Sequence, residues 1–339
     1  MDAILACTAD ERERHSRPAA EVAIGASARS LDARPFLERA RLERSTLAKL
    51  LLIGGAYFVV LATTLGIAAG PPAEWSAGQL AATCVPIVIL LAFLFETMDS
   101  AAGMGFGTAL APLLLALGYD PLAVVPVLLL SEAVTGLLSA AVHHEMRNVR
   151  FSVRRPWNEA TRLSVMIAAT GVISIITSVT LAYLALDLPK SVVKGFVTAM
   201  VVLMAVAALA RRFGNRRTVY RPKRMIAFAA WAAFNKGIGG GGYGPVITLG
   251  QLYSGVYEKS AAAITSLAEG ATSMAGFIAF LALGSAGVSI DFQLLPSVLA
   301  GSALASILSP YLVRILPNRA LGYLIPAYAL VLGVIAFVE

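Results

Sequence analysis

Two acidic residues, Glu132 and Glu269, each lie inside an otherwise apolar stretch, and they are 137 positions apart. An ionisable side chain at membrane depth is costly and by default marks a functional site. A carboxylate in such a place can carry protons, or it can accept hydrogen bonds from exposed backbone. Thr135 and Thr272 follow the two acids by three positions, which places hydroxyl and carboxylate on the same helix face. Both tasks, proton coupling and backbone support, stay open from the sequence.

A glycine cluster precedes each acid, and each cluster lies between two apolar runs. Glycines at membrane depth break a helix and expose bare backbone. The two clusters match at the same offset of 137 positions, without a gap, and the match continues to the two acids. This register indicates an internal duplication. The matched pairs are Gly103 with Gly240, Gly105 with Gly242, Phe106 with Tyr243, Gly107 with Gly244, and Gly118 with Gly255.

Broken helices of this kind favour an anion site. The first N–H groups after a break have no partner within the helix and carry partial positive charge, so two facing breaks can hold an anion. Lys236 adds a full positive charge, unless it extends to the cytoplasmic edge instead, and Thr108 and Tyr243 add hydroxyl donors. Asp99, at the position equivalent to Lys236, either pairs with Lys236 in an empty site or lies in water at a helix end. The expected substrate-binding residues are Gly103, Gly105, Phe106, Gly107, Thr108, Lys236, Gly240, Gly241, Gly242, Tyr243 and Gly244, and the expected coupling or supporting residues are Asp99, Glu132, Thr135, Glu269 and Thr272.

The composition requires a membrane protein. Hydrophobic residues make up 58% of the 339 positions and charged residues 14%, against about 25% charged residues in soluble domains. Several uncharged stretches have the length of one bilayer crossing, about 20 residues. We therefore expect an all-α polytopic membrane protein with no nucleic-acid partner. Because no nucleophile–base pair, metal-ligand spacing or nucleotide-binding motif is present, we expect no enzyme activity, metal or cofactor, and His143 and His144 are interpreted as a solvated helix end.

The chain divides into five segments on this interpretation. A cytoplasmic tail covers 1–46, disordered over 1–30 and with the option of an amphipathic surface helix over 31–46. An extra transmembrane helix covers 47–76. The first repeat covers 77–212, a basic cytoplasmic linker 213–224, and the second repeat 225–339.

Loop charges predict the orientation of these segments. Cytoplasmic loops are enriched in Lys and Arg, which places the N-terminus, 143–159 and 211–224 inside, and 70–76, 187–190 and 284–291 outside. These assignments agree only if each half crosses the membrane an odd number of times, so the two halves are inverted relative to each other and the C-terminus is periplasmic. Inverted repeats with broken helices are typical of secondary transporters.

The pattern resembles the TauE/SafE family of sulfite exporters and sulfonate permeases. The first copy carries the resemblance in Gly103–Gly107, Pro112, Gly118 and Ser131–Thr135, and the second in Gly239–Gly244, Gly255, and Thr265, Ser266 and Thr272. The resemblance implies secondary transport of a small sulfur oxyanion, such as sulfite or sulfoacetate, across the inner membrane, coupled to protons or membrane potential. Export is the first expectation; a sulfonate uptake permease, a passive anion channel and a membrane scaffold or sensor are the alternatives. The expected partners are the anion and the bilayer, with a homodimer as an option.

Overall fold

The computed structural model describes residues 23–69, 84–185, 222–285 and 291–318, and the single positions 199, 206, 320, 323, 324, 327 and 331. All regular elements within these residues are helices, which confirms the all-α architecture for this part of the chain. They are α2 (Phe36–Ala40), α3 (Arg44–Ala69), α5 (Pro86–Ala102), α6 (Phe106–Ala116), α7 (Pro121–Glu145), α8 (Glu159–Thr180) with a π-helical turn at Leu181–Ala185, α10 (Pro222–Gly239), α11 (Tyr243–Tyr253), α12 (Glu258–Ser285) and α13 (Leu295–Ile315).

The two glycine clusters break the helices as predicted. Helix α5 ends where Gly103 adopts a φ of 69°, and α6 begins after Gly105, which has a φ of 138°. Helix α10 ends before Gly240, with a φ of 73°, and α11 begins after Gly242, with a φ of 84°. Side chains other than glycine rarely adopt such φ values. The backbone therefore repeats positions of positive φ at the spacing seen in the sequence.

Within the described residues, four helices are long and apolar enough to cross a membrane: Pro121–Glu145, Glu159–Tyr183, Glu258–Gly284 and Leu295–Ile315. Their length and composition are those of a multi-pass membrane protein. The remaining predicted crossings are described in part or not at all. Helix α3 covers the first of them up to Ala69, and most of 70–83, 186–221 and 319–339 lies outside the described residues. The linker 213–224 is described only from Pro222 onward.

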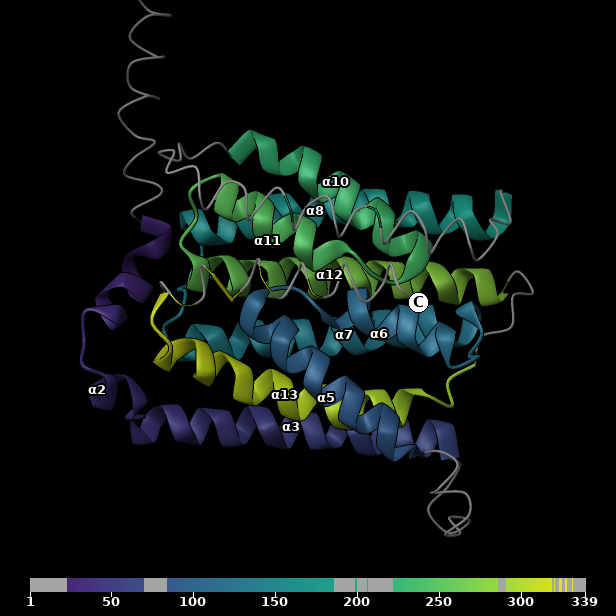
Figure 1. Ribbon diagram of the computed structural model, residues 1–339, viewed down its shortest axis with the longest axis horizontal. Helices are drawn as coiled ribbons and strands as arrows, with labels where there is room; N and C mark the ends of the chain where they lie inside the picture. Colours follow the sequence, from purple (N-terminus) through teal and green to yellow (C-terminus); the bar gives the residue numbers. More distant parts are fainter. Residues whose placement is uncertain are drawn as a thin grey trace, which may run out of the picture.

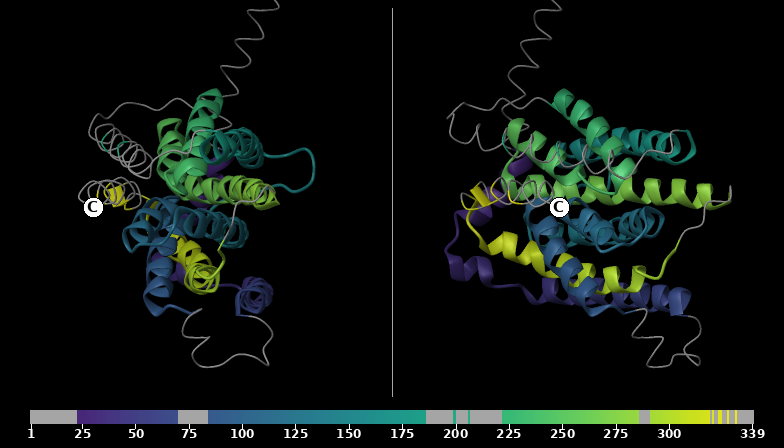
Figure 2. Two further views of the ribbon diagram at one scale, coloured as in Figure 1. Left: turned by 90° about the vertical axis from the view of Figure 1, so that its right-hand side faces the viewer. Right: turned by 45° about the vertical axis from the view of Figure 1, so that its right-hand side comes forward.

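Helices α7 and α12 form the centre of the bundle (Figures 1 and 2). They approach closely where Gly136 faces Gly270, since a Cβ on Gly136 would lie 2.9 Å from the Gly270 nitrogen. Helix α5 packs on α13, and α10 packs on α8, on opposite sides of this central pair. Each broken helix of one half therefore lies against an unbroken helix of the other half.

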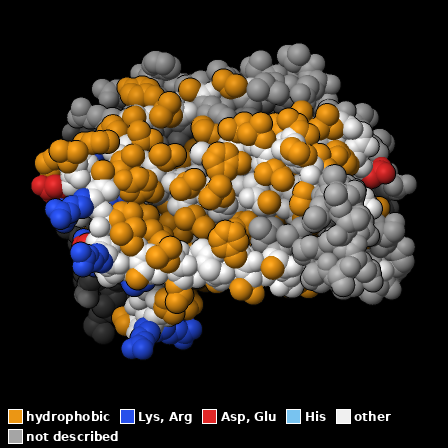
Figure 3. Space-filling view, turned by 90° about the horizontal axis from the view of Figure 1, so that it is seen from below, with side chains coloured by type: hydrophobic (Ala, Val, Ile, Leu, Met, Phe, Trp, Pro, Cys, Tyr) orange, Lys and Arg blue, Asp and Glu red, His pale blue; other side chains and the backbone are white. Residues whose placement is uncertain are grey.

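Three contacts establish the direction of the helices. Near the start of α3, Lys49 pairs with Glu145 at the end of α7 at 2.8 Å. Near the end of α13, Arg314 donates to the Met146 carbonyl at 2.9 Å, and Lys259 at the start of α12 donates to the Arg314 carbonyl at 3.2 Å. Helices α7 and α13 thus end, and α3 and α12 begin, at one end of the bundle. We call it the basic end, because Lys and Arg side chains gather there (Figure 3).

The N-terminal segment differs from the expectation. Residues 23–32 are helical, and Ile24, Ala28 and Leu31 are buried against the bundle rather than part of a disordered tail. The expected surface helix over 31–46 is interrupted, because the separate short helix α2 begins at Phe36, directly after Pro35, and α3 begins at Arg44. Residues 1–22 lie outside the described part.

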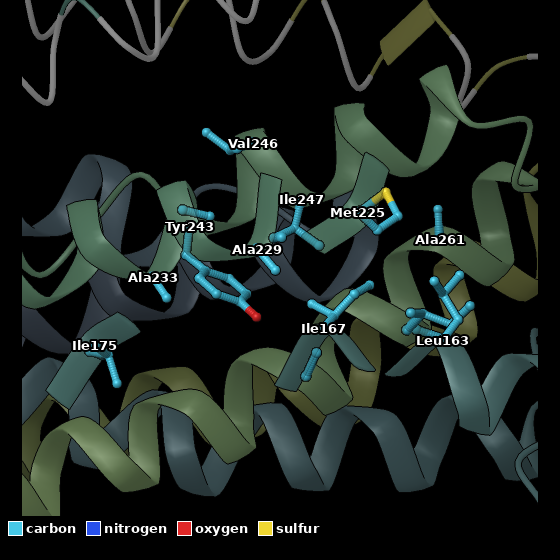
Figure 4. Packing of buried hydrophobic residues seen from close by; sticks show 14 of the residues in the cluster. Leu163, Ile167, Ile175, Met225, Ala229, Ala233, Tyr243, Val246, Ile247 and Ala261 are labelled. Atoms are coloured by element: carbon cyan, nitrogen blue, oxygen red, sulfur yellow. The ribbon is translucent and has the colours of Figure 1, made fainter. Parts of the chain in front are cut away.

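Apolar side chains cover the outside and fill the inside of the bundle. Hydrophobic side chains spread over the face seen in Figure 3, as expected for a surface in contact with lipid. The inner cluster joins α8, α10 and α11 through residues such as Ile167, Ala229 and Ile247, and Tyr243 lies among them (Figure 4). This packing holds α10 and α11, the two helices on either side of the second glycine cluster.

Candidate functional site

The two glycine turns pack directly against each other in the middle of the bundle. A Cβ on Gly107 would lie 2.3 Å from the Gly240 carbonyl oxygen, and a Cβ on Gly241 would lie 2.5 Å from the Gly107 oxygen. In the same way, a Cβ on Gly244 would lie 2.5 Å from the Gly103 carbonyl oxygen. Real side chains do not tolerate such distances, so glycine is required for the contact as much as for the turns. The backbone N–H of Gly242 also donates to Thr108 Oγ1 at 3.0 Å.

Lys236 lies at the centre of an ionic cluster. Its Nζ is 2.6 Å from Glu132 Oε2 and 2.6 Å from Glu269 Oε1, and its side chain is fully buried. The alternative in which Lys236 extends to the cytoplasmic edge is therefore wrong. The suggested pair between Lys236 and Asp99 is not formed either: Asp99 Oδ1 instead accepts from the Phe106 N–H at 3.3 Å. The two repeat-related glutamates compensate the charge of Lys236.

Carboxylates already occupy the start of helix α6, where we expected a substrate anion. The Gly107 N–H donates to Glu132 Oε1 at 3.2 Å, and the preceding N–H, of Phe106, donates to Asp99. These are two of the N–H groups that a helix start leaves unpaired. The geometry fits the backbone-support reading of Glu132, while its other oxygen contacts Lys236. Proton coupling through Glu132 and Glu269 stays a prediction.

Hydroxyl groups complete the contacts around the two breaks. Thr248 Oγ1 donates to the Gly103 carbonyl at 2.6 Å, which satisfies a carbonyl near the break between α5 and α6. The Tyr243 hydroxyl lies 3.3 Å from Thr272 Oγ1, and its ring centroid is 5.2 Å from Lys236 Nζ. This distance is within the range of a cation–π contact. Tyr243 thus contacts the ionic cluster through both its ring and its hydroxyl.

The structure adds polar residues that the sequence did not single out. Glu96 is buried and accepts from Ser100 Oγ at 2.6 Å and from Thr135 Oγ1 at 3.3 Å. Glu96 follows the same apolar run as Asp99. An acidic residue in this position could therefore have been predicted from the sequence to lie at membrane depth. Asn235, next to Lys236, is fully buried, and neither its Nδ2 nor its Oδ1 has a hydrogen-bond partner in the described part of the chain. Through Thr135, one turn after Glu132 on α7, Glu96 is connected to the surroundings of the ionic cluster.

His143 is a structural residue rather than a solvated helix end, which corrects the expectation. It is fully buried, its Nε2 lies 2.8 Å from the Ser100 carbonyl, and its Nδ1 lies 2.9 Å from Asn148 Nδ2. Since the carbonyl can only accept and the amide nitrogen can only donate, these bonds fit the neutral ring with the proton on Nε2. Asn148 also donates to the Pro310 carbonyl at 2.8 Å. His143 thus connects α5, α7 and α13.

The site as a whole is closed to solvent. Lys236 is 0% exposed, Glu132 2% and Glu269 4%, and the residues of the two glycine turns, 103–107 and 240–244, are buried as well. In the described residues, no three His, Cys, Asp or Glu side chains meet in a metal-binding group. The arrangement can present backbone N–H groups, one ammonium and hydroxyls to an anion, and several carboxyl groups to protons.

One protein-family model, described as Sulfite exporter TauE/SafE, matches residues 88–337. The match includes both glycine turns, the ionic cluster and all four candidate spans, and begins after α3. No curated protein and no solved structure matched the chain.

Proposed function

The chain belongs to the TauE/SafE family of membrane transporters, and on that premise we propose that it is a secondary transporter that exports a small sulfur-containing oxyanion across the inner membrane. The proposed substrates are sulfite and short organosulfonates such as sulfoacetate. The observation that carries this proposal is the meeting of two broken helices around Lys236, because their N–H groups and the ammonium together suit a compact anion.

The substrate would replace a carboxylate. Glu132 bonds both the Gly107 N–H and Lys236, so it makes the two contacts that a bound oxyanion needs. An oxyanion that enters would displace Glu132 from one or both of them. Asn235 would add a neutral donor, since its amide has no partner in the described residues. The predicted binding set is therefore the glycine turns with Thr108, Lys236 and Tyr243, and Asn235 is added to it.

The two halves would act as inverted repeats, with the N-terminus cytoplasmic and the C-terminus periplasmic. Two observations support this. The glycines with positive φ recur at the same spacing, for example Gly118 at 93° and Gly255 at 84°. The corresponding helices α7 and α12 also run in opposite directions. Alternating access would then move one set of helices against the other around the central site.

The charge of the cluster decides what can drive transport. With Glu96, Asp99, Glu132 and Glu269 all ionised, the cluster would repel an anion, so protons that enter with the anion would favour binding. A proton for each negative charge makes the transported species neutral. Without protons, the membrane potential itself drives an anion outward, by about 2.3 kcal/mol per charge per 100 mV. Potential-driven export and proton-coupled uptake are thus distinct outcomes.

Flux in proteoliposomes tests the proposal. Vesicles containing the full-length protein are loaded with sulfite or sulfoacetate, and a potassium diffusion potential or a pH gradient is imposed separately. Export driven by the potential supports the first reading. Uphill accumulation that requires the pH gradient supports uptake, and flux that only dissipates gradients supports a channel. Glu132→Gln should alter flux, whereas Glu145→Gln, on the same helix at the basic end, should not; no flux of any sulfur oxyanion would refute the function.

A further inference from the structure

The N-terminal segment 23–41, which we call the latch, covers the basic end of the bundle. It comprises the helical residues 23–32 and α2 with its flanks, and it lies before the residues that match the family model. Its contacts therefore have no role assigned by the family. Three groups of polar contacts join it to α12, to α13 and to the end of α7.

Asp32 makes the contact to α12. Its Oδ1 lies 2.6 Å from Lys259 Nζ, and its Oδ2 accepts from the Tyr257 hydroxyl at 2.6 Å. Arg39 of α2 pairs with the same Oδ1 at 3.3 Å. Burial, together with the hydrogen bond to Asp32, raises the pKa of Tyr257 above its usual value, so the hydroxyl stays a donor. Lys259 is 0% exposed, and Asp32 is the carboxylate that compensates its charge.

The end of α13 is bound through Arg314 and Tyr311. The Arg314 guanidinium donates to the carbonyl oxygens of Arg39 at 2.7 Å and Arg41 at 3.4 Å, and to that of Met146 after α7 at 2.9 Å. The Tyr311 hydroxyl donates to the Ala40 carbonyl at 2.9 Å. One arginine therefore connects the latch, α13 and the end of α7.

The end of α7 is also bound directly. Ser27 Oγ donates to the Arg147 carbonyl at 2.9 Å. Ser260 Oγ, at the start of α12, lies within 3.3 Å of the Ile24 carbonyl and 3.1 Å of the Asn148 carbonyl. The latch thus crosses the junction where α7 of the first repeat meets α12 and α13 of the second.

We propose that the latch is a lock that holds the basic end of the transporter shut. This inference rests on the proposed function, because the central site is buried and an anion reaches it only if one end opens. Opening the basic end would separate α7 from α12 and α13, and the contacts that join the latch to these three helices would together oppose that movement. Release of Asp32 shifts the population toward the state that is open at this end.

Cysteine accessibility tests the lock without reference to transport. Cys7 and Cys84 are replaced by serine, and Ser139→Cys is introduced as the reporter, since Ser139 is 0% exposed and lies one turn from Gly136 toward the basic end. A cationic methanethiosulfonate reagent is added to the full-length protein in detergent. We expect Asp32→Ala to raise the modification rate of the introduced cysteine at least about tenfold, which corresponds to about 1.4 kcal/mol.

Two variants control for misfolding and for unrelated charge loss. The conservative variant Asp32→Glu keeps the carboxylate that Lys259, Arg39 and Tyr257 share, and should keep the rate close to that of the parent. Glu159→Gln removes a pair with Arg162 that lies within α8, and should leave the rate unchanged. Equal rates for Asp32→Ala and the parent, or an Asp32→Glu protein as fast as Asp32→Ala, would overturn the lock. Faster modification in a protein that moves no sulfur oxyanion would instead refute the transport function and leave the lock standing.

Discussion

Gly107 and Gly241, which are far apart in the sequence, meet with their backbones in direct contact. A Cβ on Gly107 would lie 3.3 Å from the Gly241 Cα, and a Cβ on Gly241 would lie 2.5 Å from the Gly107 oxygen. The two turns therefore form one structural unit. The N–H groups after each break reach the same small region only because no side chain separates them.

The first prediction is that Gly107→Ala disrupts this unit. Its methyl group would meet the Gly240 oxygen at 2.3 Å and Glu132 Oε1 at 2.7 Å, so the turns must move apart. Overpacking of this kind costs about 1–3 kcal/mol. We expect a lower melting temperature in detergent and loss of flux. Gly55→Ala in α3 is the matched control, because a Cβ there meets nothing within 4 Å. A Gly107→Ala protein that is as stable and active as the control would show that the turns are not in close contact.

The second prediction concerns Lys236. Lys236→Met leaves Glu132 and Glu269 buried without their cation, and removing one partner of a buried pair costs about 3–5 kcal/mol. We expect a large fall in thermal stability as well as loss of flux. Lys49→Met removes a pair whose lysine side chain is 59% exposed, and it should cost at most about 1 kcal/mol.

A triple variant separates folding from transport at this site. Combining Lys236→Met with Glu132→Gln and Glu269→Gln removes the cation together with its two partners, so neither glutamate is left buried without its cation. A glutamine at position 132 can still accept from the Gly107 N–H. We expect the melting temperature to recover most of its loss while flux stays absent. Recovery of flux in the triple variant would remove Lys236 and both glutamates from the transport mechanism.

The sequence predicted the parts of this site that depend on residue type. A glycine cluster or an acid within an apolar run differs in residue type from its neighbours in the sequence, whatever the fold. Residue type and spacing alone therefore identify Gly103, Gly240, Glu132 and Glu269. The residues with which these side chains pair could not be predicted from the sequence in the same way. Lys236 was assigned to the substrate, but it pairs with two glutamates because α10, α7 and α12 converge on one point. That convergence depends on packing between segments far apart in the sequence.

His143 and Asp32 illustrate the same limit from the other side. Each lies close to charged neighbours in the sequence, which favours exposure. Both instead bind groups from distant helices: His143 contacts Ser100 and Asn148, and Asp32 contacts Lys259. The local sequence does not show which distant residues these side chains contact. For this reason Asp32 was predicted to lie in a cytoplasmic tail and His143 at a solvated helix end.

The third prediction tests His143 as a structural residue. His143→Leu leaves the Ser100 carbonyl without this partner and removes one of the two acceptors of the Asn148 amide. An unsatisfied buried polar group costs about 1–3 kcal/mol, so the melting temperature should fall clearly. Since the ring is neutral and bonded at both nitrogens, the pH dependence of flux should be unchanged in whatever active protein is recovered. A shifted pH profile at wild-type stability would point to a proton-carrying role instead.

The fourth prediction tests the support of the first break by α11. Thr248→Val keeps the shape of the side chain but removes the hydroxyl that bonds the Gly103 carbonyl at 2.6 Å and lies 2.9 Å from Thr265 Oγ1. We expect a loss of about 1–3 kcal/mol in unfolding free energy, together with reduced flux, because the break between α5 and α6 loses one of its hydrogen bonds to the second half. Thr170→Val is the matched control: its hydroxyl donates to the Met166 carbonyl of its own helix at 2.9 Å, so both stability and flux should stay close to wild type. If the two valine variants behave alike, the contact from Thr248 does not hold the two broken helices together.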